Sequence, residues 1–261
     1  ELDQKKDVIA NIKDNVVRKD KILLEEPVFL LREELREPST YAKILEAIAQ
    51  GAGKLNDIST RTGVEVYKLA KYLNVLMELN YVERITPVTI TKAKSKISLY
   101  RIKDVFFRFW YRFIFPIKSE IEMGELNRLS DNLKRDFSEY VGRIFEEIGS
   151  EAIKLVYPNF TRMGRWWGHY RDEEGNRSEV EIDICGVNDQ TTEILFGECK
   201  WQSEVNARKI LEQLKEKAKR VEWNNLKRKE YYVIFAQSFK EKINEENVIL
   251  VNLEKLKTIF A

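Results

Sequence analysis

The chain has 261 residues, a formal net charge of +2 and 43% hydrophobic residues, among them 13 Phe, 11 Tyr and 5 Trp, which excludes a disordered chain and favours two domains at roughly 100–200 residues each. Two cysteines exclude a disulfide framework and a four-cysteine zinc site, and a single histidine excludes mechanisms that need two imidazoles. Because no run of about 18 apolar residues and no signal-peptide core occurs, the sequence predicts a cytoplasmic protein with no membrane partner.

The first 103 residues are predicted to be mainly helical. Residues 1–26 place apolar side chains at helical spacing, which predicts one amphipathic helix with a trailing turn. Ser39 and Thr40 are expected to cap the next helix. The further predicted elements are helices at residues 39–51, 55–61 and 66–79 and strands at 81–85 and 97–102. Three helices followed by a hairpin predict a winged helix-turn-helix over residues 27–103.

The predicted hairpin is basic. Between residues 84 and 103 all its charged side chains are cationic: Arg84, Lys92, Lys94, Lys96, Arg101 and Lys103. This pattern fits a wing that lies against DNA phosphates, with Lys92, Lys94, Lys96 and Arg101 as candidate contacts. The alternative is a winged helix that binds protein, since the preceding helix is not strongly basic and shows no pattern for reading bases.

Residues 104–135 are predicted to be an aromatic helix and a polar connector. The stretch VFFRFWYRFIFPI at residues 105–117 is the most aromatic part of the chain and is interrupted by Arg. A helix that is apolar on most sides must be covered by other elements, so it is predicted to lie in a core. Stacking of bases on these rings is the alternative.

From residue 136 to 261 the sequence alternates between helical and strand patterns and predicts one αβ domain with a central mixed sheet. The predicted helices are residues 137–155, 205–221 and 253–260, and the predicted strands are 161–170, 179–187, 193–201, 231–236 and 248–252. The second and third strands are expected to pair as an antiparallel hairpin, and the fourth to lie parallel to the third. The fold class is therefore predicted as mixed α+β, with a helical N-terminal part.

Three polar residues of the predicted hairpin suggest a catalytic site. Alternation along residues 179–187 turns Val180, Ile182 and Ile184 inward and puts Asp183 on an acidic outer face. Glu198 and Lys200 are two residues apart on the neighbouring strand, so they share a face. Two carboxylates from adjacent strands beside a lysine can bind Mg²⁺ or Mn²⁺ for phosphodiester hydrolysis. The alternative is a solvated face with cross-strand ion pairs.

Four short stretches together resemble the PD-(D/E)xK nuclease superfamily, which includes the archaeal Holliday-junction resolvases. They are GRIFEEIG, RMGRWWG, EIDI and GECKW. More closely, the chain from about residue 24 onward resembles the C-terminal region of a family of archaeal DEXX-box, AAA-like ATPases. In that family a nuclease-like domain follows a winged helix, and the ATPase module and its helical lid precede both.

This resemblance implies a restriction-endonuclease-like domain at residues 136–261 and makes residues 1–26 the end of the lid. It implies that Asp183 and Glu198 bind the metal with the backbone carbonyl of Cys199, and that Lys200 orients or activates water. Glu146 would complete the metal shell. One departure is Ile182, which stands where the superfamily often has proline. The neighbouring acidic residues Glu147, Glu151 and Glu181 stay open as alternatives.

The remaining polar features are a glycine-rich stretch, two arginines and the single histidine. GAGK at residues 51–54 lacks the remaining positions of a phosphate-binding loop, so no ATP site is expected in this chain. Arg162 and Arg165 could clamp DNA phosphate or pair with Glu179 or Glu181. The lone His169 is expected to be structural or solvated.

The leading hypothesis is thus the C-terminal part of an archaeal ATPase that acts on DNA through a metal-dependent nuclease-like domain. The upstream ATPase module and DNA are the expected partners, and self-association is left open. The alternatives are a catalytically silent DNA- or protein-docking module and a winged-helix transcriptional regulator.

Overall fold

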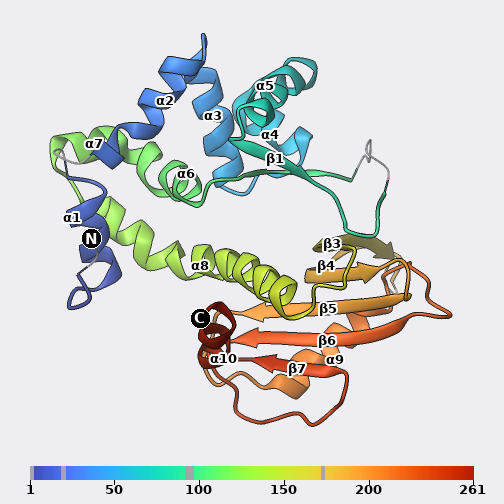
Figure 1. Cartoon of the computed structure of the whole chain (residues 1–261). Helices are drawn as coiled ribbons and strands as arrows, with labels where there is room; N and C mark the ends of the chain where they lie inside the picture. The colour runs from blue at the N-terminus through green and yellow to red at the C-terminus, as the bar shows by residue number, and fades with distance from the viewer. Residues whose placement is uncertain (1–2, 19–21, 92–96, 172–173) are drawn as a thin grey trace. The chain divides into compact units, whose positions relative to one another are not determined.

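The computed structural model describes residues 3–18, 22–91, 97–171 and 174–261, which form helices and a five-stranded mixed sheet as the α+β prediction requires. The chain divides into two compact units, described separately below. The first comprises Glu1–Ile85 and Ser98–Phe137, and the second comprises Thr86–Ile97 and Ser138–Ala261. Figure 1 shows the elements in chain order. No helix among the described residues is long and apolar enough to cross a membrane.

The first unit begins with short helices. The helix and trailing turn predicted for residues 1–26 are present, but the helix is short: α1 covers Val8–Asn15, and a 3-10 turn, Ile22–Leu24, leads into α2 at Glu26–Glu34. The side chain of Asp7 fixes the start of α1 by accepting from the Ala10 N–H at 2.7 Å.

Three helices and a two-stranded hairpin follow. They are α3 (Pro38–Ala49), α4 (Leu55–Thr62), α5 (Val66–Glu78), β1 (Val82–Ile85) and β2 (Leu99–Ile102). Fully buried Ile44, Ile58 and Leu73 contribute one side chain from each helix to this core. The predicted capping by Ser39 and Thr40 is wrong. Pro38 is the first residue of α3, and the N-cap residue Glu37 makes no side-chain capping bond.

The aromatic stretch is buried, as predicted, but it is not one regular helix. It consists of α6 (Val105–Phe109), a π-helical turn (Trp110–Ile114) and a 3-10 turn (Phe115–Ile117), followed by α7 (Lys118–Met123). Trp110 and Tyr111 are fully buried, and the Trp110 indole donates to the carbonyl of Leu24 at 3.2 Å. The stretch therefore forms the core of the first unit.

The second unit consists of the five-stranded sheet with helices on both faces. Its elements are the end of α8 (Asn127–Val156), β3 (Arg162–Arg171), β4 (Arg177–Asn188), β5 (Glu193–Lys200), α9 (Ala207–Ala218), β6 (Lys229–Ala236), β7 (Val248–Val251) and α10 (Leu253–Phe260). The strand order is β3-β4-β5-β6-β7. The predicted antiparallel β4–β5 hairpin and the parallel pairing of β5 with β6 are both confirmed.

Two apolar layers hold the sheet between its helices. On one face α9 contributes Ile210 and Leu214 to a cluster with Phe196. On the other, Phe145 and Ile153 of α8 pack in a second cluster. These layers fix the positions of α8 and α9 relative to β4 and β5.

A β-bulge changes the expected face of the residues around Asp183. The pairing of β3 with β4 shifts between Gly164 and Trp166, which pair with Cys185 and Ile182 respectively. As a result Ile182 and Cys185 both pack on the α9 side, whereas Ile184 packs on the α8 side. The simple alternation predicted for this strand is therefore wrong after Ile182.

The outer edge of β3 is covered by residues of the segment 86–91. The Val88 N–H donates to the Arg165 carbonyl at 3.0 Å, and the Trp166 indole donates to the Thr89 hydroxyl at 3.1 Å. The first of these bonds satisfies a backbone carbonyl on an edge that would otherwise offer unpaired backbone groups.

Candidate functional site

The candidate site lies where β4 and β5 stop pairing. The last pair of their ladder is Ile184 with Gly197, so Asp183 and Glu198 occupy the next position on each strand. Gly197 is required there, since a Cβ atom would lie 2.9 Å from Ile184 Cβ and from Val233 Cγ1. The close packing around this glycine thus fixes the separation at which the two carboxylates leave the sheet.

Asp183 is held by the backbone of the neighbouring strand. Its Oδ2 accepts a hydrogen bond from the Cys199 N–H at 2.9 Å. Burial raises the pKa of Asp183 to about 6, the negative charge of Glu198 adds to the rise, and the bond from Cys199 opposes it. The prediction for Cys199 concerned its carbonyl, and the structure brings its N–H into the site.

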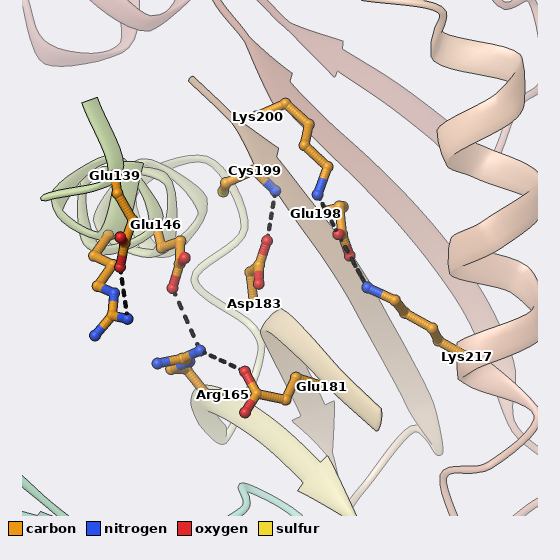
Figure 2. Close-up of polar contacts among 10 residues, drawn as sticks. Glu139, Glu146, Arg165, Glu181, Asp183, Glu198, Cys199, Lys200 and Lys217 are labelled. Carbon is orange, nitrogen blue, oxygen red and sulfur yellow. Dashed lines mark hydrogen bonds and ion pairs between the residues drawn. The ribbon is translucent and has the colours of Figure 1, made fainter. Parts of the chain in front are cut away.

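Glu198 is buried and is bound by two lysines. Only 7% of its side chain is exposed. The Lys200 ammonium donates to Oε1 at 2.7 Å, and the Lys217 ammonium donates to Oε1 at 3.0 Å and to Oε2 at 2.8 Å. Figure 2 shows Lys217 reaching Glu198 from a helix, while Asp183 points toward Cys199. Both oxygens of Glu198 are therefore already paired with cations.

Lys200 is a cation at this site. Burial of its ammonium works to lower the pKa of Lys200, but the hydrogen bond to Glu198 and the charge of that carboxylate raise it overall. The residue therefore stays protonated at neutral pH. It can donate hydrogen bonds to water or phosphate and cannot act as a proton acceptor there.

Glu146 approaches from α8. Burial and then the charge of Asp183 raise its pKa to about 7, while Arg165 opposes the rise. Arg165 lies 3.6 Å from Glu146 and 3.1 Å from Glu181, so it bridges a helix and a strand. Figure 2 shows Glu146 and Arg165 on the side of Asp183 away from Lys217. The predicted set of Asp183, Glu198, Lys200 and Glu146 is thus gathered in one region.

Each predicted nucleic-acid contact among the described residues is paired with a carboxylate. Arg162 pairs with Asp189 at 2.8 Å and donates to the Val88 carbonyl. Arg101 donates to Glu83 on the opposite strand at 2.9 Å. The three hairpin lysines Lys92, Lys94 and Lys96 lie outside the described residues. Arg165 has the expected partner Glu181, whereas Arg162 binds Asp189 in place of either expected glutamate.

Glu151, Glu181 and His169 each lie beside a charged side chain, and the partner of Glu181, Arg165, also contacts Glu146. Glu151 pairs with Lys154 on its own helix at 2.6 Å, and Glu181 is bound to Arg165. His169 lies 3.9 Å from Glu179 on the paired strand. Within the described ranges, no three His, Cys, Asp or Glu side chains form a ready-made metal cluster. A metal here would use oxygens from Asp183 and Glu198 together with backbone or water oxygens.

Lys217 is the residue that sequence reasoning missed. In the sequence, Lys217 is one of several cations on the helix predicted at residues 205–221, a pattern typical of a solvated face. A signal was present: Lys217 follows Ile210 by seven residues and Leu214 by three, so it continues an apolar stripe. A lysine in such a stripe calls for a buried partner, and here that partner is Glu198.

The chain is similar in sequence to an archaeal and bacterial protein family and to an archaeal protein. Residues 110–210 match the model of the family DUF234, described as "Archaea bacterial proteins of unknown function". An uncharacterized protein of Methanocaldococcus jannaschii is 36% identical over 248 residues, which are 92% of this chain and 53% of that protein. The chain thus spans about half the length of this relative. A crystal structure of a Vibrio cholerae protein aligns over 93% of this chain and 56% of its own, at 11% identity and a TM-score of 0.32, a likeness too distant to inform fold or function.

Proposed function

We propose that the second unit carries a metal-dependent site that hydrolyses phosphodiester bonds in DNA, like the PD-(D/E)xK nucleases. The observation that carries this proposal is the meeting of Asp183, Glu198 and Lys200 where β4 and β5 cease to pair. Two carboxylates this close repel each other when both are ionised. A divalent cation between them would remove the repulsion, and their oxygens are the donors that Mg²⁺ and Mn²⁺ prefer.

Each residue would have a distinct role in this reaction. Asp183 and Glu198 would hold the ion, with the Cys199 carbonyl and Glu146 completing its shell. The ion would supply a polarised water and neutralise charge on the phosphate. Because Lys200 keeps its proton, its ammonium would orient the attacking water or bind the phosphate.

For the first unit we propose a winged helix that binds DNA. The order α3, α4, α5, β1, β2 supports it, and the first turn of α5 leaves the Tyr67 side chain largely exposed, at 63%. The resemblance to archaeal DEXX-box, AAA-like ATPases extends the proposal to the whole protein: this chain would be the C-terminal part, and ATP would bind to an upstream module outside it.

A catalytically silent docking module is the second candidate. It is favoured by the pairing of both Glu198 oxygens with lysines, which gives the carboxylate partners without any metal. Under this alternative the sheet would bind DNA or protein for the ATPase and cleave nothing. A transcriptional regulator based on the winged helix would likewise show no cleavage.

Substitutions at Lys200 and Asp183 should affect Mn²⁺ binding and DNA cleavage differently. Lys200→Ala should still bind Mn²⁺, at least as tightly as the unaltered chain, since carboxylates hold the ion and a cation bound to Glu198 is removed, but should lose cleavage by roughly 100-fold or more because the water is no longer oriented. Asp183→Ala should lose both. Calorimetry with Mn²⁺ and cleavage of duplex, junction and single-stranded DNA in Mg²⁺ or Mn²⁺ measure the two effects.

Lys219→Ala is the matched control, because Lys219 is the C-cap of α9 and 67% of its side chain is exposed. It should behave like the unaltered chain in both assays. If the unaltered chain cleaves none of these substrates, also when joined to the upstream module with ATP, the nuclease proposal is wrong and the docking module is favoured.

A further inference from the structure

Lys217 is placed to control Glu198. Its ammonium bridges both carboxylate oxygens, at 2.8 and 3.0 Å, and Lys200 adds a third bond at 2.7 Å. An ionised carboxylate has about four acceptor positions, so the two lysines take up most of its capacity. Asp183, in contrast, has a hydrogen bond from a neutral backbone N–H. The two carboxylates are therefore neutralised very unequally.

Fold stability alone does not explain this arrangement. Lys217 lies beside Leu214 and Ala218 on a helix face that packs on the sheet. Removing two charges from water costs free energy, and an apolar pair of similar volume is often as stable or more stable. A methionine in the same stripe could fill the space of the lysine stem without a charge. The positive charge is therefore better explained by the chemistry of the site.

We propose that Lys217 is a resident counter-ion, which holds and neutralises Glu198 while the site lacks a divalent cation and releases this carboxylate when a cation binds. The inference rests on the proposed function, because it needs Asp183 and Glu198 to share that cation. A metal at ~2.0–2.6 Å from an oxygen of Glu198 would lie within a few ångströms of the Lys217 ammonium. The two positive charges repel strongly at that distance in a partly buried site, so one displaces the other.

Release of Lys217 would also add a phosphate contact. The side chain is 30% exposed, so its four-carbon stem has room to turn its ammonium toward solvent. The freed cation would then stand beside Lys200 at the edge of the site, where a substrate phosphate must approach. Lys217 is thus a positioning residue for Glu198 and a candidate binding group for the phosphate once the metal is present.

The test is Mn²⁺ binding to the full chain after treatment with a chelator, measured by calorimetry. Lys217→Met should bind Mn²⁺ at least about tenfold more tightly than the unaltered chain, because the competing charge is gone. Lys219→Met, two residues further along the chain at the C-cap of α9 and exposed to solvent, should leave the affinity unchanged. With Glu198→Gln already in place, Lys217→Met should no longer tighten binding, since the shared carboxylate is missing.

If Lys217 has a purely structural role, its substitution should leave the affinity for Mn²⁺ unchanged or lower it. If Lys217→Met has a melting temperature like the unaltered chain but binds Mn²⁺ equally or more weakly, the counter-ion proposal is overturned and the metal site stands. Lys217→Gln replaces it should the methionine variant not fold. Tighter binding without DNA cleavage by any variant would support the counter-ion and count against the nuclease. Absence of Mn²⁺ binding in every folded variant would overturn both.

Discussion

Glu146 is the residue whose ionisation links the site to stability. Its pKa is raised from 4.5 to about 7, first by burial and then by the charge of Asp183. A carboxyl with a higher pKa in the folded protein stabilises the fold below the unfolded value and loses that contribution as the pH rises through the folded one. Without metal, the free energy of unfolding should therefore fall between about pH 4.5 and pH 7.

Glu146→Gln should remove part of this fall, on the order of 2 kcal/mol, in urea unfolding measured across that pH range with a chelator present. Glu151→Gln is the control on the same helix, because Glu151 is 62% exposed and pairs with Lys154. The same pH profile for Glu146→Gln and the unaltered chain would contradict the raised pKa.

At the residue scale the sequence predicted the carboxylates better than the cations around them. Asp183 and Glu198 could be paired because a short antiparallel hairpin leaves few possible registers. The partners of Glu198 could only be half predicted: Lys200 follows from strand spacing, but Lys217 comes from a helix that begins later in the chain. Its inward direction depends on how α9 is rotated on the sheet, which the charge pattern alone does not define.

Two glycines of α8 provide a prediction for the helix that carries Glu146. A Cβ at Gly149 would lie 3.0 Å from Ile184 Cδ1 and 3.1 Å from Cys199 Sγ, whereas a Cβ at Gly142 would meet only Trp201 Cβ at 3.9 Å. Gly142→Ala should raise stability by about 0.5–1 kcal/mol, because alanine restricts the unfolded chain and the site has room. Gly149→Ala should lower stability by about 1–3 kcal/mol through overpacking.

Urea unfolding of the two variants measures the difference, and the pair is matched in helix and in substitution. Since Gly149 packs against Cys199, which lies between Glu198 and Lys200, its substitution should also weaken Mn²⁺ binding. Equal stability changes for the two variants would show that α8 does not pack as closely on Ile184 as the structure has it.

At the element scale, strands were more predictable than the helices that join the two halves of the chain. The β4–β5 hairpin followed from composition and turns. The β-bulge between the Gly164 and Trp166 pairs could not be predicted from the sequence, because a spacing of apolar residues does not reveal an inserted residue. The sequence predicts a polar connector up to residue 135 and a separate helix over residues 137–155, whereas α8 runs unbroken over Asn127–Val156. Nothing in the polar sequence between them stops a helix.

At the scale of the whole molecule, the compact units do not follow the order of the chain. Residues 86–97 belong to the second unit, although the strands on either side of them belong to the first. The reason is a pair of hydrogen bonds, which join Val88 and Thr89 to Arg165 and Trp166 of β3. Bonds between residues more than seventy positions apart in sequence leave no periodic signal, so this division could not be predicted from the sequence.

A net charge of +2 conceals a local excess of positive charge at residues 84–103. The basic residues 84–103 are proposed to bind DNA phosphates, and lysines that neutralise phosphates release the counterions condensed on the DNA. Lys92→Ala, Lys94→Ala and Lys96→Ala combined should weaken duplex binding at low salt. The slope of log K against log salt should become shallower by ~0.9 for each phosphate contact that is lost.

Three lysines elsewhere on the chain provide a control with the same loss of charge: Lys154, Lys219 and Lys229. Replacing these with alanine should leave the slope nearly unchanged if binding depends on the hairpin, because no phosphate contact is then lost. Fluorescence anisotropy with a labelled duplex at several salt concentrations measures both slopes. An equal effect of the two triple variants would mean that DNA responds to total charge, and the hairpin would then be assigned to protein contacts or to solvent.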